Sequence, residues 1–570
     1  IMKNYLLFLV LFSGSLFSQT IVSTNPENKN VILEEFTGIN CVFCPQGHSI
    51  ANGIKADNPD DVYLINIHVG GFAAPSPVQP DFRTPFGQAI DNQANLTGYP
   101  AATVNRSLFP NFSQNPGGTA MSRNFWNSAA NQILTQSSYV NVGVEAEIDI
   151  NTNLLTVHVE AYYTGDSPQA SNKLNVALLQ NNTEGPQAGG EMGNEYVHMN
   201  RLVHMLTGQW GVDINTTTQG SFIDQTFTYT IPNDYNGIPA DIYEAEMEVV
   251  AFITETQQDI ISGKGAYATY TGLPYNDDKT IKSVNEISDV CSGSISPKIE
   301  IQNLGSNPLN SVDIEYSVNN ESPQVYTWNG NLDPLFSEEI QLPEILFNLQ
   351  STNQVVISVP DDEDNSNNSA STNFNLSEIF ETTDFNLSIT FDNYPQETTW
   401  DVKNSAGVEV YSGGPYSPNQ AGQTIQQSLD LVDDDCYTFT IYDSFGDGIC
   451  CGQYGDGSYT LETSDGALVI GGGDFSSSES KTYSNYNTLS VNSFDNIKFS
   501  MYPNPSQGML NISAADAFKY QIFDIQGKKL IEGKSDSLKK ELNLSNLMSG
   551  IYLVKVNIGE IFKTQKLILK

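Results

Sequence analysis

The chain has 570 residues and a formal net charge of −41 at pH 7, because 66 acidic side chains outnumber 25 basic ones. This excess of acid argues against a nucleic-acid-binding surface, which needs clustered Lys and Arg, and it favours solubility and the binding of divalent cations. The length suits roughly four domains. Glycine, proline and asparagine are frequent and helical periodicity is rare, so the sequence predicts a multidomain, mostly β protein.

Residues 1–19 predict a secretory signal peptide. Residues 2–12 combine a basic start with a short apolar run, and Ser13, Ser15 and Ser18 follow it. The run is too short to span a bilayer, and we expect cleavage near Ser18 and no transmembrane span in the mature chain. The mature protein would leave the cytoplasm, so its cysteines would meet an oxidising compartment.

Cys41 and Cys44 have C-x-x-C spacing and follow an apolar, strand-like run at residues 31–33. We predict that Cys41 sits at the N-terminus of a helix, where the macrodipole favours a thiolate, and that Cys44 resolves the mixed disulfide. The pair would rest as a redox-active disulfide. Two alternatives stay open: an inert structural disulfide, and half of a zinc site with His48 as the nearest other ligand type.

Two further residues favour redox chemistry at this pair. Glu35 lies six residues before Cys41. A carboxylate there would be buried beneath the thiols and move their proton, unless Glu34 or Glu35 faces water in the alternation of the strand. Pro100 follows an aromatic residue and precedes an apolar strand, a pattern that suits a constrained or cis proline turn.

These residues resemble the thioredoxin-like fold, in which a C-x-x-C helix follows a strand and a cis-proline precedes a later strand. The resemblance implies an α/β domain at residues 28–136, with Cys41 attacking, Cys44 resolving, Glu35 as the buried carboxylate and Pro100 facing the pair. The chain departs from the family pattern, because no Trp precedes Cys41 and a Pro follows Cys44 instead of lying between the cysteines.

Alternating apolar and polar residues predict a β-sandwich at residues 138–275. His198 and His204 within it are six residues apart, so we expect packed or solvated histidines instead of metal ligands. The signal peptide, the C-x-x-C domain and this sandwich, with Tyr196, His198 and Arg201, together resemble the Omp28-related outer-membrane protein family. That resemblance implies an architecture more than an activity.

Residues 286–375 alternate as further short strands and resemble bacterial cell-adhesion-related immunoglobulin-like domains, which implies a spacer or a binding scaffold. Cys291 has no partner within this segment, so it is either a free thiol or the partner of an odd cysteine downstream. Cys436, Cys450 and Cys451 lie within sixteen residues, which predicts a bond from Cys436 to Cys450 or Cys451.

Residues 378–486 form an acidic, Gly-Asp-rich segment that predicts a β-sandwich with a calcium site. Glycines let the backbone fold around a cation, and carboxylates supply the hard oxygen ligands that Ca²⁺ prefers. The spacing is not that of an EF-hand, and the alternative is a solvated acidic turn. The segment resembles a β-sandwich module that recurs in secreted Bacteroidetes proteins. The predicted ligands are Asp443, Asp447, Asp456, Asp392 and Glu397. No motif indicates an organic cofactor.

Residues 496–570 contain three strand-like runs that each end at a glycine turn, and a basic alternating segment closes them. They resemble the type A C-terminal sorting domain of the Bacteroidetes type IX secretion system. The resemblance implies contact with the secretion machinery and its sortase, export across the outer membrane, and removal of the domain. Anchoring at the cell surface or outer membrane, or extracellular release, would follow.

The predicted fold is therefore an N-terminal α/β thioredoxin-like domain followed by several immunoglobulin-like or jelly-roll β-sandwiches. Two functions compete. The first is thiol–disulfide exchange on exported or extracellular proteins at Cys41 and Cys44. The second is a non-enzymatic surface protein whose calcium-stabilised sandwiches bind a partner or a surface glycan.

Overall fold

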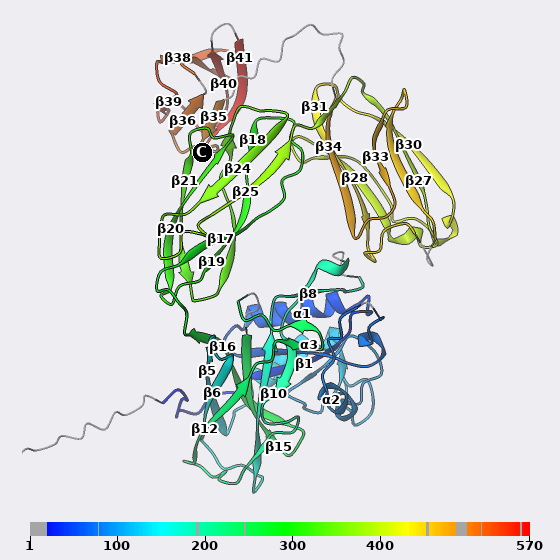
Figure 1. Cartoon of the computed structure of the whole chain (residues 1–570), viewed down its shortest axis with the longest axis vertical. Helices are drawn as coiled ribbons and strands as arrows, with labels where there is room; N and C mark the ends of the chain where they lie inside the picture. Colours follow the sequence, from blue (N-terminus) through cyan, green and yellow to red (C-terminus); the bar gives the residue numbers. More distant parts are fainter. Residues whose placement is uncertain are drawn as a thin grey trace, which may run out of the picture.

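The computed structural model describes residues 20–77, 79–189, 193–243, 247–451, 455–485, 499–514, 516–558 and 561–570. The predicted signal peptide lies outside these residues. Within them the protein is mostly β, as expected, and groups of strands follow one another along the chain from blue to red in Figure 1. No helix in this part of the chain is long and apolar enough to cross a membrane.

One sheet of twelve strands organises the first half of the chain, in the order β12-β6-β5-β16-β15-β7-β10-β2-β1-β3-β4, with β11 paired to β7. Its strands, in that order, are Phe222–Thr230, Leu154–Tyr163, Val140–Asp149, Ile260–Thr271, Met247–Glu255, Asn172–Gln180, Arg201–Met205, Val62–His68, Val31–Thr37, Ala101–Val104 and Met121–Ser122, and β11 is Val212–Ile214. The sheet therefore continues across the position at which the sequence predicts a boundary between residues 136 and 138.

Helices α1 (Cys44–Asp57) and α3 (Trp126–Leu134) pack on one face of β1 and β2, and α2 (Gly87–Ala94) packs on the other. Strand alternation explains this arrangement. Val31 and Leu33 of β1 join the core cluster with α1 and α3, whereas Ile32 and Phe36 join the cluster that contains Ile90 of α2. By the same alternation Glu35 faces α1 and Glu34 faces the opposite side.

The β1–β4 end of the sheet is joined to the remainder by a parallel pairing of β2 with β10, in which Asn66 is opposite Arg201. The backbone N–H of Asn66 donates to the Asn200 carbonyl at 2.8 Å, and its side-chain amide donates to the Met199 carbonyl at 2.9 Å. Just before β10, the strands β8 (Thr183–Gly185) and β9 (Tyr196–His198) form a separate two-stranded ribbon. This junction brings the ribbon against α1.

The remaining strands form smaller sheets in chain order (Figure 1). The third part of the chain, which runs from β17 to β25, has two sheets, in the orders β17-β19-β22 and β21-β20-β24-β25. Their strands, in those orders, are Lys279–Val284, Lys298–Asn303, Ser337–Gln341, Gln324–Leu332, Leu309–Val318, Thr352–Ser358 and Ser369–Asn375. The short strands β18 (Ser294–Ile295) and β23 (Ile345–Leu346) pair beside them, and β13 (Asp234–Tyr235) pairs with β14 (Ile238–Pro239) in the first half.

The fourth part of the chain, which runs from β26 to β34, has two sheets, in the orders β26-β34-β31-β28-β29 and β30-β27-β32-β33. Their strands, in those orders, are Glu378–Phe380, Ser478–Asn485, Asp435–Asp443, Thr398–Asn404, Glu409–Gly413, Thr424–Asp430, Asp384–Thr390, Ser458–Thr463 and Leu468–Gly472. The C-terminal part has β35-β36-β39 and β38-β37-β40-β41, with bounds Phe499–Tyr502, Met509–Ala514, Lys539–Asn543, Lys529–Ser535, Phe518–Asp524, Gly550–Ile558 and Ile561–Leu569. Each of the three later parts encloses its own apolar core cluster.

The disulfides of the later parts differ from the expectation. Cys436 bonds to Cys291, and Cys450 bonds to Cys451, so the predicted bond from Cys436 to Cys450 or Cys451 is wrong. The reason is the length of β31. Cys436 lies near its start and Cys450 beyond its end, and the seven strand residues that follow Cys436, at about 3.3 Å each, extend roughly 23 Å away from it.

Parallel pairing brings Cys291 to Cys436. The backbone around Val290 bonds to Asn375 and Ser377, directly before β26, and β34 lies between β26 and the start of β31. An ion pair of 3.0 Å between Lys481 and Asp289 supports the same junction. The Cys291–Cys436 bond therefore ties the third part of the chain to the fourth.

We predict that the double variant Cys291→Ser/Cys436→Ser lowers the free energy of unfolding of this region by about 2–4 kcal/mol, because a bond across 145 residues restricts the unfolded chain strongly. Differential scanning calorimetry measures the change. Cys450→Ser/Cys451→Ser is the matched control, since a bond between adjacent residues closes almost no loop. Equal effects of the two double variants would contradict this account of the junction.

Candidate functional site

Cys41 and Cys44 form a disulfide directly before and at the start of α1. The helix begins at Cys44, so the expectation that Cys41 itself occupies the helix N-terminus needs correction. Cys41 lies in the preceding turn, which the Cys44 backbone N–H closes by donating to the Cys41 carbonyl at 3.0 Å. No side chain caps the helix N-terminus at Phe43. Both cysteines are buried, with 3% of Cys41 and 0% of Cys44 exposed.

The segment after β8, residues 186–189, covers Cys41. The Gln187 side-chain amide donates to the carbonyls of Gly38 and Cys41 at 3.3 and 3.1 Å, and the Ala188 backbone N–H donates to the Ile39 carbonyl at 2.8 Å. Gly189 lies so close that a Cβ there would be 2.1 Å from the Val42 carbonyl oxygen. A partner can therefore reach the Cys41 sulfur from this side only after the segment moves.

Glu35, Gly47 and Pro100 lie together beneath α1. A Cβ on Gly47 would be 2.6 Å from Glu35 Oε1 and 3.0 Å from two ring carbons of Pro100, so the absence of a side chain at Gly47 leaves room for both. The Tyr99–Pro100 peptide bond is cis. Gly47 follows Cys44 by one helical turn, which places the carboxyl and the proline ring on the same face of the helix as Cys44.

Glu35 is fully buried, and neither of its carboxyl oxygens has a hydrogen-bond partner among the described residues. Burial raises the pKa of Glu35 well above its usual value, because the charged carboxylate is disfavoured away from water. Glu34 is buried as well, where it accepts two hydrogen bonds from the Arg106 guanidinium. Neither glutamate faces water, and the alternative that one of them does is wrong.

His48 connects Glu35 to the ribbon of β8 and β9. Its Nε2 lies 2.9 Å from Thr37 Oγ1 and 3.8 Å from Glu35 Oε1, and its Nδ1 lies 2.7 Å from the Tyr196 hydroxyl. Burial lowers the pKa of His48 to about 4, so the ring is neutral. Among the described residues, His48 belongs to neither of the two groups whose metal-ligand atoms converge. The zinc alternative therefore gains no support.

Two more buried histidines extend this polar cluster. His198 packs 6.5 Å from His48 and 5.2 Å from His68, measured between ring centroids, and its Nε2–H donates to the Pro186 carbonyl at 3.2 Å. Neither ring nitrogen of His68 has a partner in the part of the chain that the structure describes. From the sequence, His198 is expected to be packed or solvated. The structure shows it packed beside His48 and His68, a position that the sequence did not predict. The Tyr196-x-His198 alternation, which directs both side chains to one face of β9, was the available signal.

The acidic site in the fourth part brings together three of the five predicted metal ligands. Side-chain oxygens of Glu397, Asp443 and Asp447 all lie within 4.8 Å of one another. Asp392 is near enough for its charge to raise the pKa of Glu397. Asp456 is exposed and is not part of the converging group.

Asp443 is the structural centre of this acidic site. Its carboxylate accepts hydrogen bonds from the backbone N–H groups of Phe445, Gly446, Asp447 and Gly448 at 2.9–3.2 Å. Burial, together with the charges of neighbouring carboxylates, raises the pKa values of Asp443 and Glu397 to about 7. A divalent cation would relieve this repulsion, and three converging oxygens suit Ca²⁺ as part of a larger oxygen shell.

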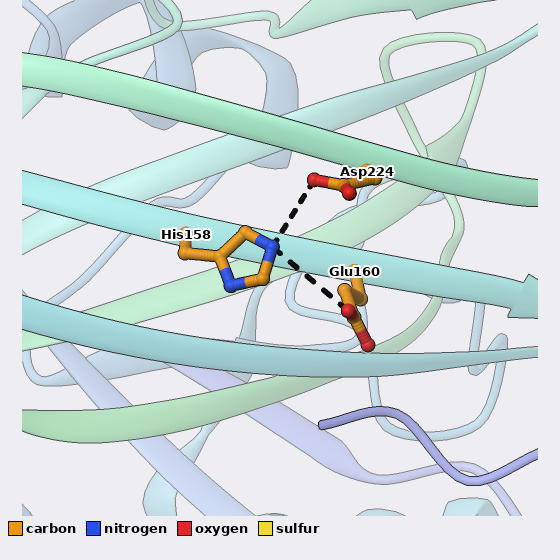
Figure 2. Close-up of side chains that lie close together, drawn as sticks. All are labelled: His158, Glu160 and Asp224. Carbon is orange, nitrogen blue, oxygen red and sulfur yellow. Dashed lines mark hydrogen bonds and ion pairs between the residues drawn. The ribbon is translucent and has the colours of Figure 1, made fainter. Parts of the chain in front are cut away.

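A third cluster lies on the surface of the twelve-stranded sheet and was not predicted. Figure 2 shows His158 Nε2 between Asp224, at 3.1 Å, and Glu160, at 3.9 Å. Asp224 of β12 lies directly opposite Glu160 of β6 in the strand register. The other Glu160 oxygen accepts from the backbone N–H groups of Ile21 and Val22 at 2.7 and 3.1 Å. The cluster therefore fixes the start of the described chain to the sheet.

Comparison with known families identifies two segments. Residues 87–264 match the family "Outer membrane protein Omp28", and residues 500–570 match the family "Secretion system C-terminal sorting domain". Both resemblances stated from the sequence are confirmed over these residues. The two family matches indicate an exported, cell-surface protein that interacts with the secretion machinery.

Solved structures show looser similarity. HBP35 of Porphyromonas gingivalis is 17% identical, with a TM-score of 0.35 and coverage of 61% of this chain and 99% of that one. A domain of the outer membrane lipoprotein Omp28 from Porphyromonas gingivalis is 16% identical, with a TM-score of 0.17 and coverage of 23% and 90%. TM-scores this low support no functional conclusion. No curated protein matches the sequence.

The packing beneath α1 predicts opposite effects for two glycine substitutions in that helix. Gly47→Ala forces a Cβ against Glu35 and Pro100 and should destabilise the protein by about 1–3 kcal/mol. Gly53→Ala is the matched control, since no atom lies within 4 Å of its Cβ position, and it should stabilise the helix by about 0.5–1 kcal/mol. Urea unfolding measures both. A neutral Gly47→Ala would show that Glu35 does not lie against the helix.

Proposed function

We propose that this exported, Omp28-related surface protein exchanges thiols and disulfides with other exported proteins through Cys41 and Cys44. The observation that carries the proposal is Glu35. A fully buried carboxyl without a hydrogen-bond partner costs free energy, and such groups concentrate where a protein uses an altered pKa. Its place under the helix that begins at Cys44 gives that altered pKa a reacting partner, because opening the disulfide produces a thiolate that needs a proton.

The roles of the residues follow from their positions. Cys41 precedes the helix and exchanges with the partner protein, and Cys44 resolves the mixed disulfide. Glu35 holds the proton of the buried thiol, and Pro100 shapes the surface beside the pair. Residues Val42 and Phe43, between the cysteines, are 47% and 60% exposed and offer an apolar contact for an unfolded segment of the partner.

Exchange requires the cover over Cys41 to open. The Gln187 amide and the Ala188 N–H hold it with three hydrogen bonds to the loop of residues 38–41. Each such bond contributes about 0.5–1.5 kcal/mol, so opening the segment is a local event and does not require unfolding of the domain.

A trapping experiment tests the proposed exchange. Full-length Cys44→Ser protein keeps Cys41 but cannot resolve, so incubation with insulin should yield a covalent mixed disulfide on a non-reducing gel and by mass spectrometry. Cys41→Ser is the control and should yield none. If Cys44→Ser captures no insulin chain, or if both variants capture it equally, the exchange activity is refuted.

The acidic site favours a second function, surface binding through calcium-stabilised sandwiches. The supporting observation is the convergence of Glu397, Asp443 and Asp447 on a protein with a net charge of −41. The cation would order the loop after β31, and a surface glycan or a partner protein is the proposed ligand of the ordered module. Removal of the C-terminal segment by the secretion sortase belongs to the same proposal, as does anchoring or release afterwards.

We predict that Ca²⁺ at about one hundred times its Kd stabilises the full chain by roughly 2.7 kcal/mol, seen as a higher midpoint of the calorimetric transition of this module. Binding should weaken from pH 7 to pH 5.5, because the carboxyls of Glu397 and Asp443, with pKa values of about 7, take up protons in competition with the cation. Asp447→Asn should abolish the shift, and Asp456→Asn should retain it. A midpoint that is the same in Ca²⁺ and in chelator would contradict the site.

A further inference from the structure

A chain of polar groups leads from Glu35 of β1 through His48 of α1 to Tyr196 of the β8–β9 ribbon at the protein surface. Glu35 Oε1 lies 3.8 Å from His48 Nε2, and His48 Nδ1 lies 2.7 Å from the Tyr196 hydroxyl. Thr37 Oγ1, 2.9 Å from the same Nε2, lies beside the first gap. Tyr196 is partly exposed, whereas Glu35 and His48 are buried. The first gap closes to a hydrogen bond with a movement of about 1 Å, and catalytic hydrogen bonds are often long before the partner binds.

The two intermediate groups are suited to passing a proton and not to storing one. Burial lowers the pKa of His48 to about 4, so its ring stays neutral, with one nitrogen able to accept and the other able to donate. Burial, with a smaller contribution from Glu35, raises the pKa of Tyr196 to about 12, so its phenol stays protonated. Burial raises the pKa of Glu35 well above its usual value, so Glu35 is the member of the chain that holds a proton ready for transfer.

Thiol–disulfide exchange creates a need for such a path. When a thiolate of a partner protein attacks the Cys41 sulfur, the Cys41–Cys44 bond breaks and Cys44 leaves as a thiolate. Cys44 then takes the proton of Glu35, which lies against Gly47 one helical turn further along α1, because burial disfavours the charged thiolate. This transfer leaves Glu35 as a buried carboxylate without a hydrogen-bond donor, a state that costs several kcal/mol unless a proton is returned.

We propose that Tyr196 and His48 return this proton from solvent to Glu35 whenever the Cys41–Cys44 disulfide opens toward an exported protein dithiol. The inference rests on the proposed exchange function and makes the protein an oxidant in it. The Tyr196 hydroxyl donates to His48 Nδ1 while His48 Nε2–H donates to the Glu35 carboxylate, and water replaces the phenol proton. The ring returns to its starting tautomer when the pair is reoxidised, because a proton then leaves along the same hydrogen bonds in the opposite direction, from Glu35 to His48 Nε2 and from His48 Nδ1 to Tyr196 and water.

The step balances. The second thiolate of the partner attacks the partner's sulfur in the mixed disulfide and releases Cys41, so the partner dithiol loses two electrons and two protons and becomes a disulfide. The cysteine pair gains the two electrons, Cys44 gains a proton by way of Glu35, and Cys41 leaves as a thiolate or takes a proton from water. An external disulfide must reoxidise the pair before the next cycle.

Three further titratable groups of the described residues pack around this path. The titratable groups that face it are His198 of β9, whose pKa burial lowers to about 3, His68 of β2, whose pKa burial lowers well below its usual value, and Arg201 of β10. Both histidines stay neutral, and Arg201 stays charged. These groups contribute to the electrostatic field around the path, and the proton itself is transferred through His48 and Tyr196.

The test follows the reduction of the Cys41–Cys44 disulfide in the oxidised, full-length protein by dithiothreitol at pH 7. Acid quenching, alkylation and peptide mass spectrometry separate this disulfide from the two others. Tyr196→Phe and His48→Gln should each slow reduction by about tenfold or more, within the range of general acid–base catalysis. Added imidazole should restore the rate in proportion to its concentration, because it carries protons to the vacated path. A purely structural role would not produce this buffer dependence.

Matched controls come from outside the path. His204→Gln changes a histidine that stacks on Tyr229 at 4.1 Å, and Tyr139→Phe removes a hydroxyl bonded to Glu255, and both should keep the wild-type rate. Tyr196→Phe retains the ring, so it decides the question if His48→Gln does not fold. Wild-type rates in Tyr196→Phe, or slow rates that ignore imidazole, would overturn the relay. Wild-type protein whose disulfide resists dithiothreitol would instead overturn the exchange function itself.

Discussion

The hydrogen bonds from Asn66 to the residues just before strand β10 are the interaction on which the site depends. The backbone and side-chain amides of Asn66 bind the carbonyls of Asn200 and Met199 and join the two halves of the sheet. Because β9 ends two residues before Asn200, this junction places Tyr196 and His198 behind the C-x-x-C helix and the segment of residues 186–189 over Cys41. Without this junction, the first half of the sheet would still hold the cysteine pair. Residues 186–189 would not lie over Cys41, and Tyr196 and His198 would not pack behind the helix.

The burial that makes Glu35 useful also restricts access to the cysteines. Burial raises the pKa of the Glu35 carboxyl, and the same packing leaves Cys41 almost unexposed beside the Gln187 segment. The protein resolves these opposing demands by placing the cover on a short segment held by few hydrogen bonds. In the proposed exchange, a local opening would expose Cys41 while Glu35 stays buried beneath the helix, and the pair would select partners able to displace the segment.

The sequence pointed to the first part of the site. The position of Glu35, six residues before Cys41, indicated a carboxylate beneath the thiols, and the resemblance to the thioredoxin-like fold implied that Pro100 faces the pair. The contact of His48 with Tyr196 joins residues 148 positions apart, and no local pattern encodes such a distance. The twelve-stranded sheet escaped prediction for the same reason, since parallel pairing of β2 with β10 is non-local.

The later parts of the chain show the same limit. Glycine and aspartate spacing predicted the convergence of Glu397, Asp443 and Asp447, because the turn after β31 is local and Glu397 directly precedes the neighbouring strand β28. The set of metal ligands predicted from spacing also included Asp456, whose exposed side chain lies outside that group. The cysteine pairing failed because proximity in sequence is a poor guide when an extended strand separates the two positions.

The reduction potential of the Cys41–Cys44 disulfide tests the central claim most directly. Full-length protein is equilibrated with glutathione buffers of graded potential, and the oxidised fraction of this pair is measured by alkylation and mass spectrometry. An exchange-active pair should titrate within the range of catalytic disulfides, about −120 to −270 mV. A potential below about −300 mV, typical of inert structural disulfides in secreted proteins, would contradict the account.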